Sequence, residues 1–395
     1  MSVTLEDIIE NPDILEEEPE RKPISNRRRI VIIAAIIVLI LVGGYVIFLY
    51  QEYRDYTVER KTDSPMTGES KYEDFSGNML RYNNDGALFT DYDDNILWNE
   101  TYEMASPCVD RAVSYFILYD RGGSQILLMN DTGLVRRLGT TLPVTKACVS
   151  DNGVVAVLMQ TTGVSYIHLY NSKGDTIASG EIHTAKGGYP VTLAISADGK
   201  ELCVSMLNLN DGAVNTNINF YNYGLEGQGA IDNLVGTFSY TNMIIPEVAY
   251  VSGDRILAFG DSEVVVFKGG TEIAVEAEIF AQSEIKSIFY NKDYFATING
   301  ETDENGEPVN RMHVYKLNGS EKLVRDLEFP YTKAEFLSND EILITDGNKA
   351  VIYTTYGVKK FEYEFENNLY EVMSGRGFKD YTFIMSDSVE RVRLK

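Results

Sequence analysis

ACVSDNGVVAVL (Ala147–Leu158), followed by GVSYIHLYNSKG (Gly163–Gly174), is the stretch that decides the fold. A polar turn ending in Gly153 supplies a residue free to take positive φ, as a tight hairpin requires. The flanking apolar runs are rich in valine, have the length of strands and show no helical period. The stretch therefore predicts a short strand, a tight turn, a long buried strand, a third strand and a glycine hairpin leading to an outer strand.

The same pattern recurs along the chain. It returns at Leu193–Ser205 with Asn217–Gly224, at Val248–Phe259 with Val264–Gly270, and at Lys333–Thr345 with Ala350–Gly357. The glycines that close the last hairpin of each copy stand at 133, 174, 224, 270, 319 and 357, at spacings of 41, 50, 46, 49 and 38 residues. A four-stranded unit repeated at about 40 to 50 residues is the signature of a β-propeller. The expected fold class is therefore all-β.

The number of blades follows from the inner strands. These are expected to begin near Lys71, Pro107, Val144, Pro190, Pro246, Ile285, Thr332 and Leu369, which makes eight blades. Seven is the alternative, if the weak first or last copy is not a blade of its own. The last copy ends after three strands, at Val389–Arg393, and an unpaired sheet edge needs a partner. Because Tyr56–Arg60 alternates like a strand, we predict that it pairs with Val389–Arg393 and closes the ring.

The segment Ile30–Leu49 is different from everything around it. Its twenty residues include only one hydrogen-bonding side chain, Tyr45, and as a helix it would span about 30 Å, the thickness of a bilayer core. The sequence therefore predicts a transmembrane helix at 30–50 between an acidic tail at 1–29 and a stalk at 51–70. The propeller would occupy residues 71–395.

Charges at the ends of this segment predict its orientation. Arg27–Arg29 precede it and Gln51–Glu52 follow it, so the N-terminus should be cytoplasmic and the propeller extracellular. The apolar run is longer than that of a signal peptide, and no small-x-small cleavage site follows. We therefore expect an uncleaved, single-pass anchor in the cell membrane.

Composition limits the possible partners and the cysteine chemistry. The chain has 59 acidic and 35 basic residues and a net charge of −24, which argues against a nucleic-acid partner. Three cysteines, Cys108, Cys148 and Cys203, form no CxxC motif and suggest neither a disulfide scaffold nor a zinc ribbon. We interpret them as buried thiols, with a Cys108–Cys148 bridge between neighbouring inner strands as the alternative.

Motifs of catalysis are missing from the sequence. His168 and His313 occupy equivalent strands, so we interpret them as a recurring position of the repeat and not as metal ligands. No HExxH, G-x-S-x-G or P-loop motif occurs. We therefore expect neither an enzyme nor a cofactor.

Two loops exceed what the repeat needs, Met206–Thr216 and Asn299–Asn310. Calcium prefers oxygen ligands, and the second loop offers them in four residues, Glu301, Asp303, Asn305 and Glu307. The alternative is a solvated acidic hairpin, because the spacing is not that of an EF-hand.

The segment Gly77–Trp98 is similar to a quinoprotein repeat, and the repeats in general resemble quinoprotein-type and WD40-type propellers. The chain departs from both, with a single tryptophan and no Trp-Asp or Gly-His dipeptide, so the tryptophan-docked geometry cannot be carried over. The acidic tail, one apolar span and Tyr-rich repeats beginning Tyr72-x-x-Phe75 resemble domain-of-unknown-function family 5711. That resemblance implies a membrane-anchored, propeller-like protein of Gram-positive bacteria and supplies no activity and no site.

The expected function is a binding or scaffold module whose partner is a protein or a cell-envelope glycan. One alternative is a surface sensor coupled to the cytoplasmic tail, and another is a hydrolase or lyase that uses carboxylates in the central channel. Converging channel carboxylates with raised pKa values would favour the enzyme. A broad exposed aromatic patch would favour the scaffold.

Overall fold

The computed structural model describes residues 26–63, 70–209, 212–252, 254–270 and 272–395. The chain divides into two compact units, Met1–Gln51 and Glu52–Lys395. In the first unit, helix α2 (Asn26–Leu49) follows the part of the predicted acidic tail that lies outside the described residues. The large apolar side chains of α2 between Ile30 and Val42 are 48% to 74% exposed.

By length and hydropathy together, none of the helices in the described ranges qualifies as one that crosses a membrane. The helix predicted at residues 30–50 is therefore present, and that finding does not support its transmembrane assignment.

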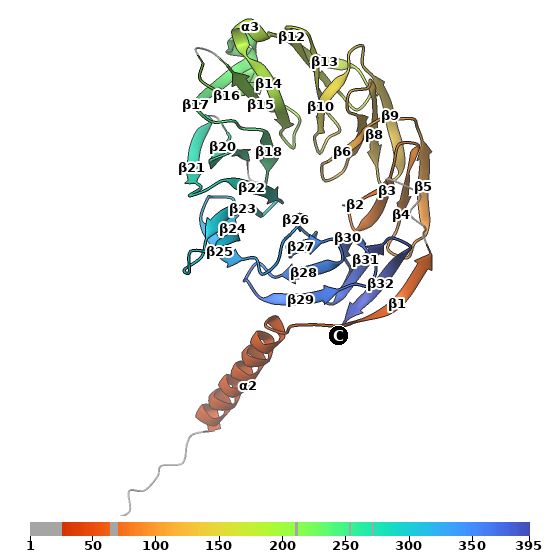
Figure 1. Ribbon diagram of the computed structural model, residues 1–395, viewed down its shortest axis with the longest axis vertical. Coiled ribbons are helices and arrows are strands. Elements are labelled where there is room, and N and C mark those ends of the chain that lie inside the picture. The colour runs from red at the N-terminus through yellow and green to blue at the C-terminus, as the bar shows by residue number, and fades with distance from the viewer. Residues whose placement is uncertain (1–25, 64–69, 210–211, 253, 271) are drawn as a thin grey trace, which may run out of the picture. The chain divides into compact units, whose positions relative to one another are not determined.

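The second unit is a ring of four-stranded antiparallel sheets, which we call blades (Figure 1). Blades 1 to 4 are β2 (Lys71–Phe75), β3 (Asn78–Tyr82), β4 (Gly86–Thr90), β5 (Ile96–Thr101); β6 (Pro107–Arg111), β7 (Phe116–Asp120), β8 (Gln125–Asn130), β9 (Gly133–Gly139); β10 (Val144–Val149), β11 (Val155–Thr161), β12 (Val164–Tyr170), β13 (Thr176–His183); and β14 (Tyr189–Ile195), β15 (Glu201–Asn208), β16 (Asn215–Asn222), β17 (Leu234–Thr241). Blades 5 to 8 are β18 (Glu247–Val251), β19 (Arg255–Phe259), β20 (Glu263–Lys268), β21 (Ala274–Phe280); β22 (Ile285–Tyr290), β23 (Tyr294–Thr302), β24 (Pro308–Lys316), β25 (Glu321–Asp326); β26 (Lys333–Phe336), β27 (Ile342–Asp346), β28 (Lys349–Tyr353), β29 (Lys359–Glu364); and β30 (Leu369–Ser374), β31 (Asp380–Met385), β32 (Ser388–Leu394), β1 (Tyr56–Asp63).

The blade count and the inner strands agree with the sequence. The described ranges form eight sheets, so the eight-blade prediction is confirmed and the seven-blade alternative is wrong. Five inner strands begin at the predicted residue, and the other three begin one residue away, at Tyr189, Glu247 and Lys333. Neighbouring sheets bury both sides of the second strand, so this strand appears in the sequence as a continuous apolar run. Together with the polar turn before it, that run is enough to locate a blade.

Strand β1 closes the ring, as predicted, and is longer than expected. It pairs antiparallel with β32 from Tyr56 opposite Leu394 to Asp63 opposite Ser388, so the two ends of the propeller share one sheet (Figure 1). Just upstream, Tyr53 is only 1% exposed, and its backbone N–H donates to the carbonyl of Lys360 at 2.8 Å. Closure therefore covers the edge that the three-stranded last repeat would leave open.

Apolar side chains fill the gaps between neighbouring blades, and two of the turn glycines are part of that packing. Gly319 has φ 82°, and a Cβ atom there would collide with the side chain of Ala277 on the outer strand of the preceding blade. A Cβ at Gly357, φ 82°, would lie 2.7 Å from Cδ1 of Leu323. Glycine is therefore needed at these positions both for the turn and for the close approach of two blades.

The single tryptophan joins the first two blades. Trp98 on β5 stacks on Phe89 of its own blade and on Phe116 of blade 2, with ring centroids 5.1 and 6.1 Å away.

All three cysteines are free thiols. Cys148 and Cys203 are buried and Cys108 is half-buried, so the alternative of a Cys108–Cys148 bridge is wrong.

Candidate functional site

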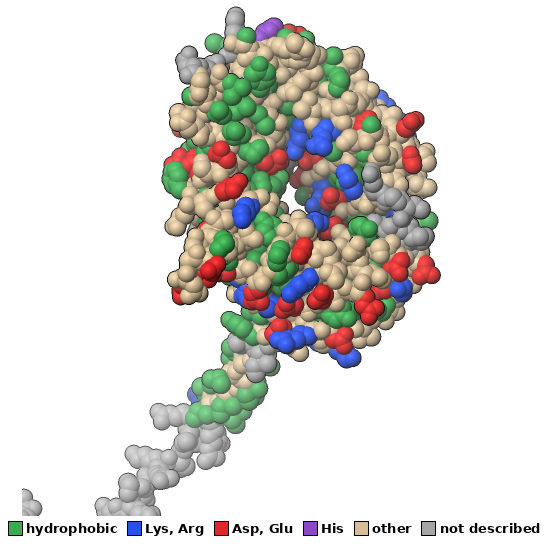
Figure 2. Space-filling model, viewed as in Figure 1, with side chains coloured by type: hydrophobic (Ala, Val, Ile, Leu, Met, Phe, Trp, Pro, Cys, Tyr) green, Lys and Arg blue, Asp and Glu red, His purple; other side chains and the backbone are tan. Residues whose placement is uncertain are grey.

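The inner strands surround a channel along the ring axis, which Figure 2 shows as the opening at the centre of the ring. Side chains from β2, β6, β22, β26 and β30 line a cavity of about 670 Å³ in it. Ligand pockets are typically about 300 to 1,000 Å³, so this cavity has the size of a small-ligand site. Its lining combines tyrosines such as Tyr290 and Tyr370 with acidic and basic side chains.

Three carboxylates reach this channel from equivalent strand positions. Glu73, Glu335 and Glu371 are each the third residue of their inner strand, on β2, β26 and β30. Because strand side chains alternate between faces with a period of two, the same position in each blade presents its side chain in the same direction. All three are half-buried and line the cavity.

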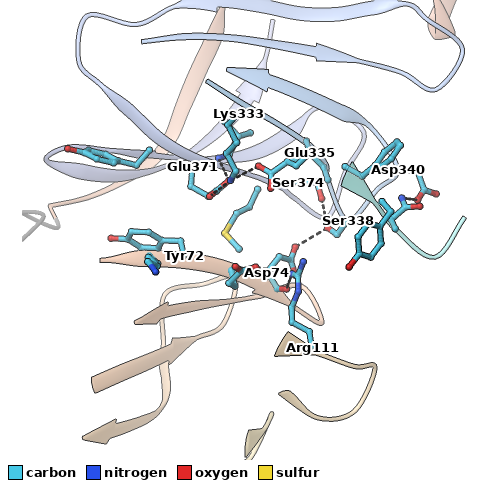
Figure 3. Close-up of a pocket in the computed structure, with 18 of the residues that line it drawn as sticks. Tyr72, Asp74, Arg111, Lys333, Glu335, Ser338, Asp340, Glu371 and Ser374 are labelled. Carbon is cyan, nitrogen blue, oxygen red and sulfur yellow. Dashed lines mark hydrogen bonds and ion pairs between the residues drawn. The ribbon is translucent and has the colours of Figure 1, made fainter. Parts of the chain in front are cut away.

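Lys333 holds two of these carboxylates together (Figure 3). Its Nζ lies 2.6 Å from Oε2 and 2.8 Å from Oε1 of Glu371, and 2.8 Å from Oε1 of Glu335. Burial, with the nearby charge of Glu335, raises the pKa of Glu371 to about 8, although Lys333 opposes the shift. Burial tends to lower the pKa of Lys333, but the two carboxylates raise it overall. The cluster thus contains a charged ammonium and a carboxyl group that can exchange a proton near neutral pH.

The opposite wall joins blades 1 and 2 to blades 7 and 8. Nη1 of Arg111 lies 3.4 Å from Oε2 of Glu73 and donates to the backbone oxygen of Asp74 at 2.5 Å. Burial raises the pKa of Glu73. The hydroxyl of Ser338 donates to Oδ2 of Asp74 at 2.9 Å and lies 2.6 Å from that of Ser374 (Figure 3).

A second charged pair connects inner strands of blades 3 and 5. Nζ of Lys146 lies 3.3 Å from Oε1 of Glu247, and burial raises the pKa of Glu247. Burial also raises the pKa of Asp110 on β6 to about 6. The backbone N–H of Val149 donates to the carboxylate of Asp110, and this hydrogen bond opposes the shift. The described channel lining therefore offers charges of both signs, which suits hydrogen bonding to a polar ligand.

The two predicted long loops emerge on the same face of the ring. We call the end of the channel where the inner strands begin the entry face. Since strands alternate in direction, the turns between second and third strands lie on this face. The hairpins β15–β16 and β23–β24 have the longest strands of any such pair, with 8 and 9 residues each, and carry the loops predicted at Met206–Thr216 and Asn299–Asn310.

Two of the four candidate calcium ligands, Glu301 and Asp303, make other contacts. Glu301 accepts a hydrogen bond from Arg311 at 2.8 Å and lies 2.9 Å from Nε2 of His313. Oδ1 of Asp303 accepts from the backbone N–H groups of Asn305 and Glu307 at 2.8 and 2.9 Å, which closes the hairpin turn. Among residues whose placement is described, no group of three or more His, Cys, Asp or Glu residues is arranged to hold a metal ion.

Both strand histidines occupy the predicted repeat position. His168 on β12 and His313 on β24 lie in the third strands of blades 3 and 6. Nδ1 of His168 lies 3.2 Å from the hydroxyl of Tyr170.

Sequence reasoning missed Glu73, Lys333, Glu335 and Glu371 altogether. Part of a signal was present, since Glu73 and Glu371 are the third residues of two predicted inner strands and Glu335 is the fourth residue of another, counted from Thr332.

The profile of a family of unknown function, DUF5711, matches residues 49–394. Among solved structures, the C-terminal WD40 domain of Sif2 is similar with a TM-score of 0.58 at 10% identity, covering 87% of this chain and 99% of that chain. A eukaryotic initiation factor is similar with a TM-score of 0.50 at 11% identity, covering 85% and 83%. No curated protein matches. At such identities the likeness shows the propeller fold alone.

Proposed function

Since the chain belongs to the DUF5711 family of unknown function, we propose its role from geometry. It is a membrane-anchored extracellular propeller that binds a protein or a cell-envelope glycan on its entry face.

One observation carries this proposal. The hairpins β15–β16 and β23–β24 exceed their counterparts in other blades, and both extend at the entry face. Insertions that gather on one face of a repeat protein are typical of its binding face, because the scaffold needs no such length for its own packing. The channel cavity adds polar and aromatic groups from blades 1, 2, 6, 7 and 8.

The anchoring part of the proposal rests on α2. A run of twenty residues, Ile30–Leu49, contains no charge, and its large apolar side chains up to Val42 pack against nothing that covers them. Apolar side chains exposed on all sides of a helix are stable in lipid and costly in water. The arginines at 27–29 favour a cytoplasmic N-terminus and an extracellular propeller.

A second candidate function is acid–base catalysis in the channel. It is favoured by the raised pKa of Glu371, about 8, next to the second carboxylate of Glu335. Binding is the better supported function because ion-pair networks with a structural role also shift pKa values, and Lys333 contacts both carboxylates at 2.6 to 2.8 Å. A Glu371→Gln variant that lost a hydrolytic activity on cell-envelope glycans would favour catalysis.

Site-specific photo-crosslinking in intact cells tests the binding proposal. A photoreactive amino acid at Tyr370, which lies in the channel lining and is 50% exposed, is compared with one at Val113, which is 74% exposed in the turn between β6 and β7 on the opposite face. We expect capture of a protein or glycan from entry-face positions only. No capture from any entry-face position would overturn the proposal.

A further inference from the structure

We infer that the entry face of blades 4 to 6 docks a protein segment that presents apolar residues flanked by basic ones. This inference rests on the proposed function and names the partner that the entry face fits.

Exposed large apolar side chains gather on this part of the ring. Tyr189, Leu209, Ile244 and Phe280 are 50%, 58%, 39% and 70% exposed. They come from the start of β14, the β15–β16 hairpin, the connection into β18 and the end of β21, all of which lie on the entry face. Figure 2 shows hydrophobic side chains gathered over the sector that Figure 1 labels β14–β17. Grouped exposed apolar side chains of this kind mark interaction sites.

Backbone pairings show that these residues come from neighbouring positions. Tyr189 pairs with Leu207, two residues before Leu209 in the same hairpin. On the other strand of that hairpin, Thr216 donates through its hydroxyl to the backbone oxygen of Met243 at 2.7 Å, beside Ile244.

The same chain of contacts continues into blade 5. The backbone N–H of Asp261 donates to the carbonyl of Ile244 at 3.0 Å. In the adjacent strand pair, Glu263 lies opposite Phe280. The apolar residues therefore form one surface across blades 4 and 5.

An acidic border adjoins this apolar surface on blades 5 and 6. Asp261, Glu284, Glu304 and Glu307 are exposed there, in the β19–β20 turn, the connection into β22 and the β23–β24 hairpin. The nearby Lys286 donates to the side chain of Asn310 at 2.8 Å. Negative charge dominates this border, so a basic partner is complementary to it.

The chemistry of the surface selects the occupant. Leucine, isoleucine and phenylalanine side chains offer a glycan no hydrogen bonds, whereas they fit the apolar anchors of a peptide segment. A second copy of this acidic chain or an anionic lipid surface would bring like charges together. A protein segment with apolar and basic residues satisfies both parts of the surface.

The first experiment places the photoreactive amino acid at Leu209 or Phe280 in the full chain, in intact cells. Val113 on the opposite face and Ile96 on β5, which is 66% exposed, serve as matched apolar controls. We expect capture from the first two positions and not from the controls. The crosslink should map to a segment of the captured protein that is both apolar and basic.

The second experiment measures binding of a synthetic 18-residue amphipathic peptide, with leucines on one face and lysines on the other, to the full chain in detergent. We expect Leu209→Ser with Phe280→Ser, and separately Glu304→Lys with Glu307→Lys, to weaken binding about tenfold or more. Val113→Ser and Glu59→Lys, at exposed positions elsewhere, should change it less than twofold.

The outcomes separate the two proposals. Capture at Tyr370 without capture at Leu209 or Phe280, or equal binding of a peptide with its lysines replaced by glutamates, overturns the docking surface and leaves the binding function in place. Glycan capture at Leu209 or Phe280 also overturns it. Absence of capture at all three positions overturns both.

Discussion

Blade 3 and blade 8 both pack against their neighbours through apolar clusters, but the interfaces of blade 8 also contain buried charges. Blade 3 contacts its neighbours through apolar clusters, with Ile117 and Leu128 against Val157 on one side and Leu158 against Leu193 on the other. Six charged side chains are buried within the described ranges, and four of them belong to blades 7 and 8: Glu341, Lys360, Glu390 and Arg391.

Buried charges lie in both interfaces of blade 8, contributed by blade 7 on one side and by blade 8 itself on the other. Toward blade 7, Nζ of Lys360 lies 2.5 Å from Oε1 of Glu341, and the hydroxyl of Tyr381 donates to the other oxygen of that carboxylate. Toward blade 1, Nη2 of Arg391 donates to Oδ1 of Asp94 at 2.8 Å.

The difference follows from how each blade is assembled. Blade 3 is contiguous in the sequence, so short turns bring its strands together and non-directional apolar packing is sufficient. Blade 8 pairs Tyr56 with Leu394. Bringing together two residues so far apart in the chain costs conformational entropy, which the contacts of blade 8 must offset. We interpret the buried polar contacts as a device that selects one register for closure, since hydrogen-bonded charges tolerate misplacement poorly.

Removing the closing strand should have the largest effect. Deletion of residues 1–63 leaves the outer edge of β32 unpaired, whereas deletion of 1–51 keeps Tyr53 and β1. We expect the first variant to aggregate or to lose its cooperative melting transition, and the second to keep it. Circular dichroism and size-exclusion chromatography check this, and a monomeric, cooperatively folded 64–395 chain would show that closure by β1 is dispensable.

Replacing the buried cation should come next. Lys360→Met leaves the carboxylate of Glu341 buried without its cationic partner, and loss of one member of a buried pair costs about 3–5 kcal/mol. Leu128→Met in the apolar interface of blade 3 keeps volume and chemistry and should cost less than about 1.5 kcal/mol. Urea unfolding measures both, and equal costs would remove the contrast between the two blades.

A glycine at a blade contact should matter more than one in an open turn. Gly319→Ala places a methyl group against Ala277 at positive φ and should cost about 2 kcal/mol or more. Gly306→Ala has a similar φ of 87° but no atom within 4 Å, so we expect about 1 kcal/mol. If the two variants unfold at the same urea concentration, the close approach of the blades contributes nothing.

The smallest expected effect is a pH dependence at the channel wall formed by blades 7 and 8. The pKa of Glu371 is raised from its usual 4.5 to about 8, so the native state binds more protons than the unfolded state between these values. Stability from this group is therefore greatest below pH 4.5 and declines as the pH rises toward 8. Glu371→Gln should reduce the decline by on the order of 1 kcal/mol, whereas Glu304→Gln in the exposed hairpin should not. Unfolding at pH 5, 7 and 9 measures the difference.

The repeat was readable because its signals are local. A polar turn with glycine and a valine-rich run specify a hairpin within about a dozen residues, so all eight inner strands were located to within one residue. The closing strand was also predicted, because an unpaired edge and an alternating segment such as Tyr56–Arg60 are both visible in the sequence.

The interactions between the channel residues were not predicted, although the inner strands that carry them were. Nothing near Glu371 in the sequence indicates that Lys333 lies 2.6 Å away, since the two residues belong to different blades. The calcium hypothesis stays a prediction, and the sequence likewise did not show that Arg311 and His313 on the neighbouring strand contact the carboxylate of Glu301.

By itself the sequence determined the class of fold, the number and order of blades, and the segment that closes the ring, because each depends on turn chemistry and strand periodicity over short distances. Only the tertiary structure decided which charges meet in the channel, which apolar side chains share the entry face, and where buried ion pairs accompany apolar packing. Those features depend on contacts between residues far apart in the chain, and a side chain's environment is set by whatever the closed ring brings next to it.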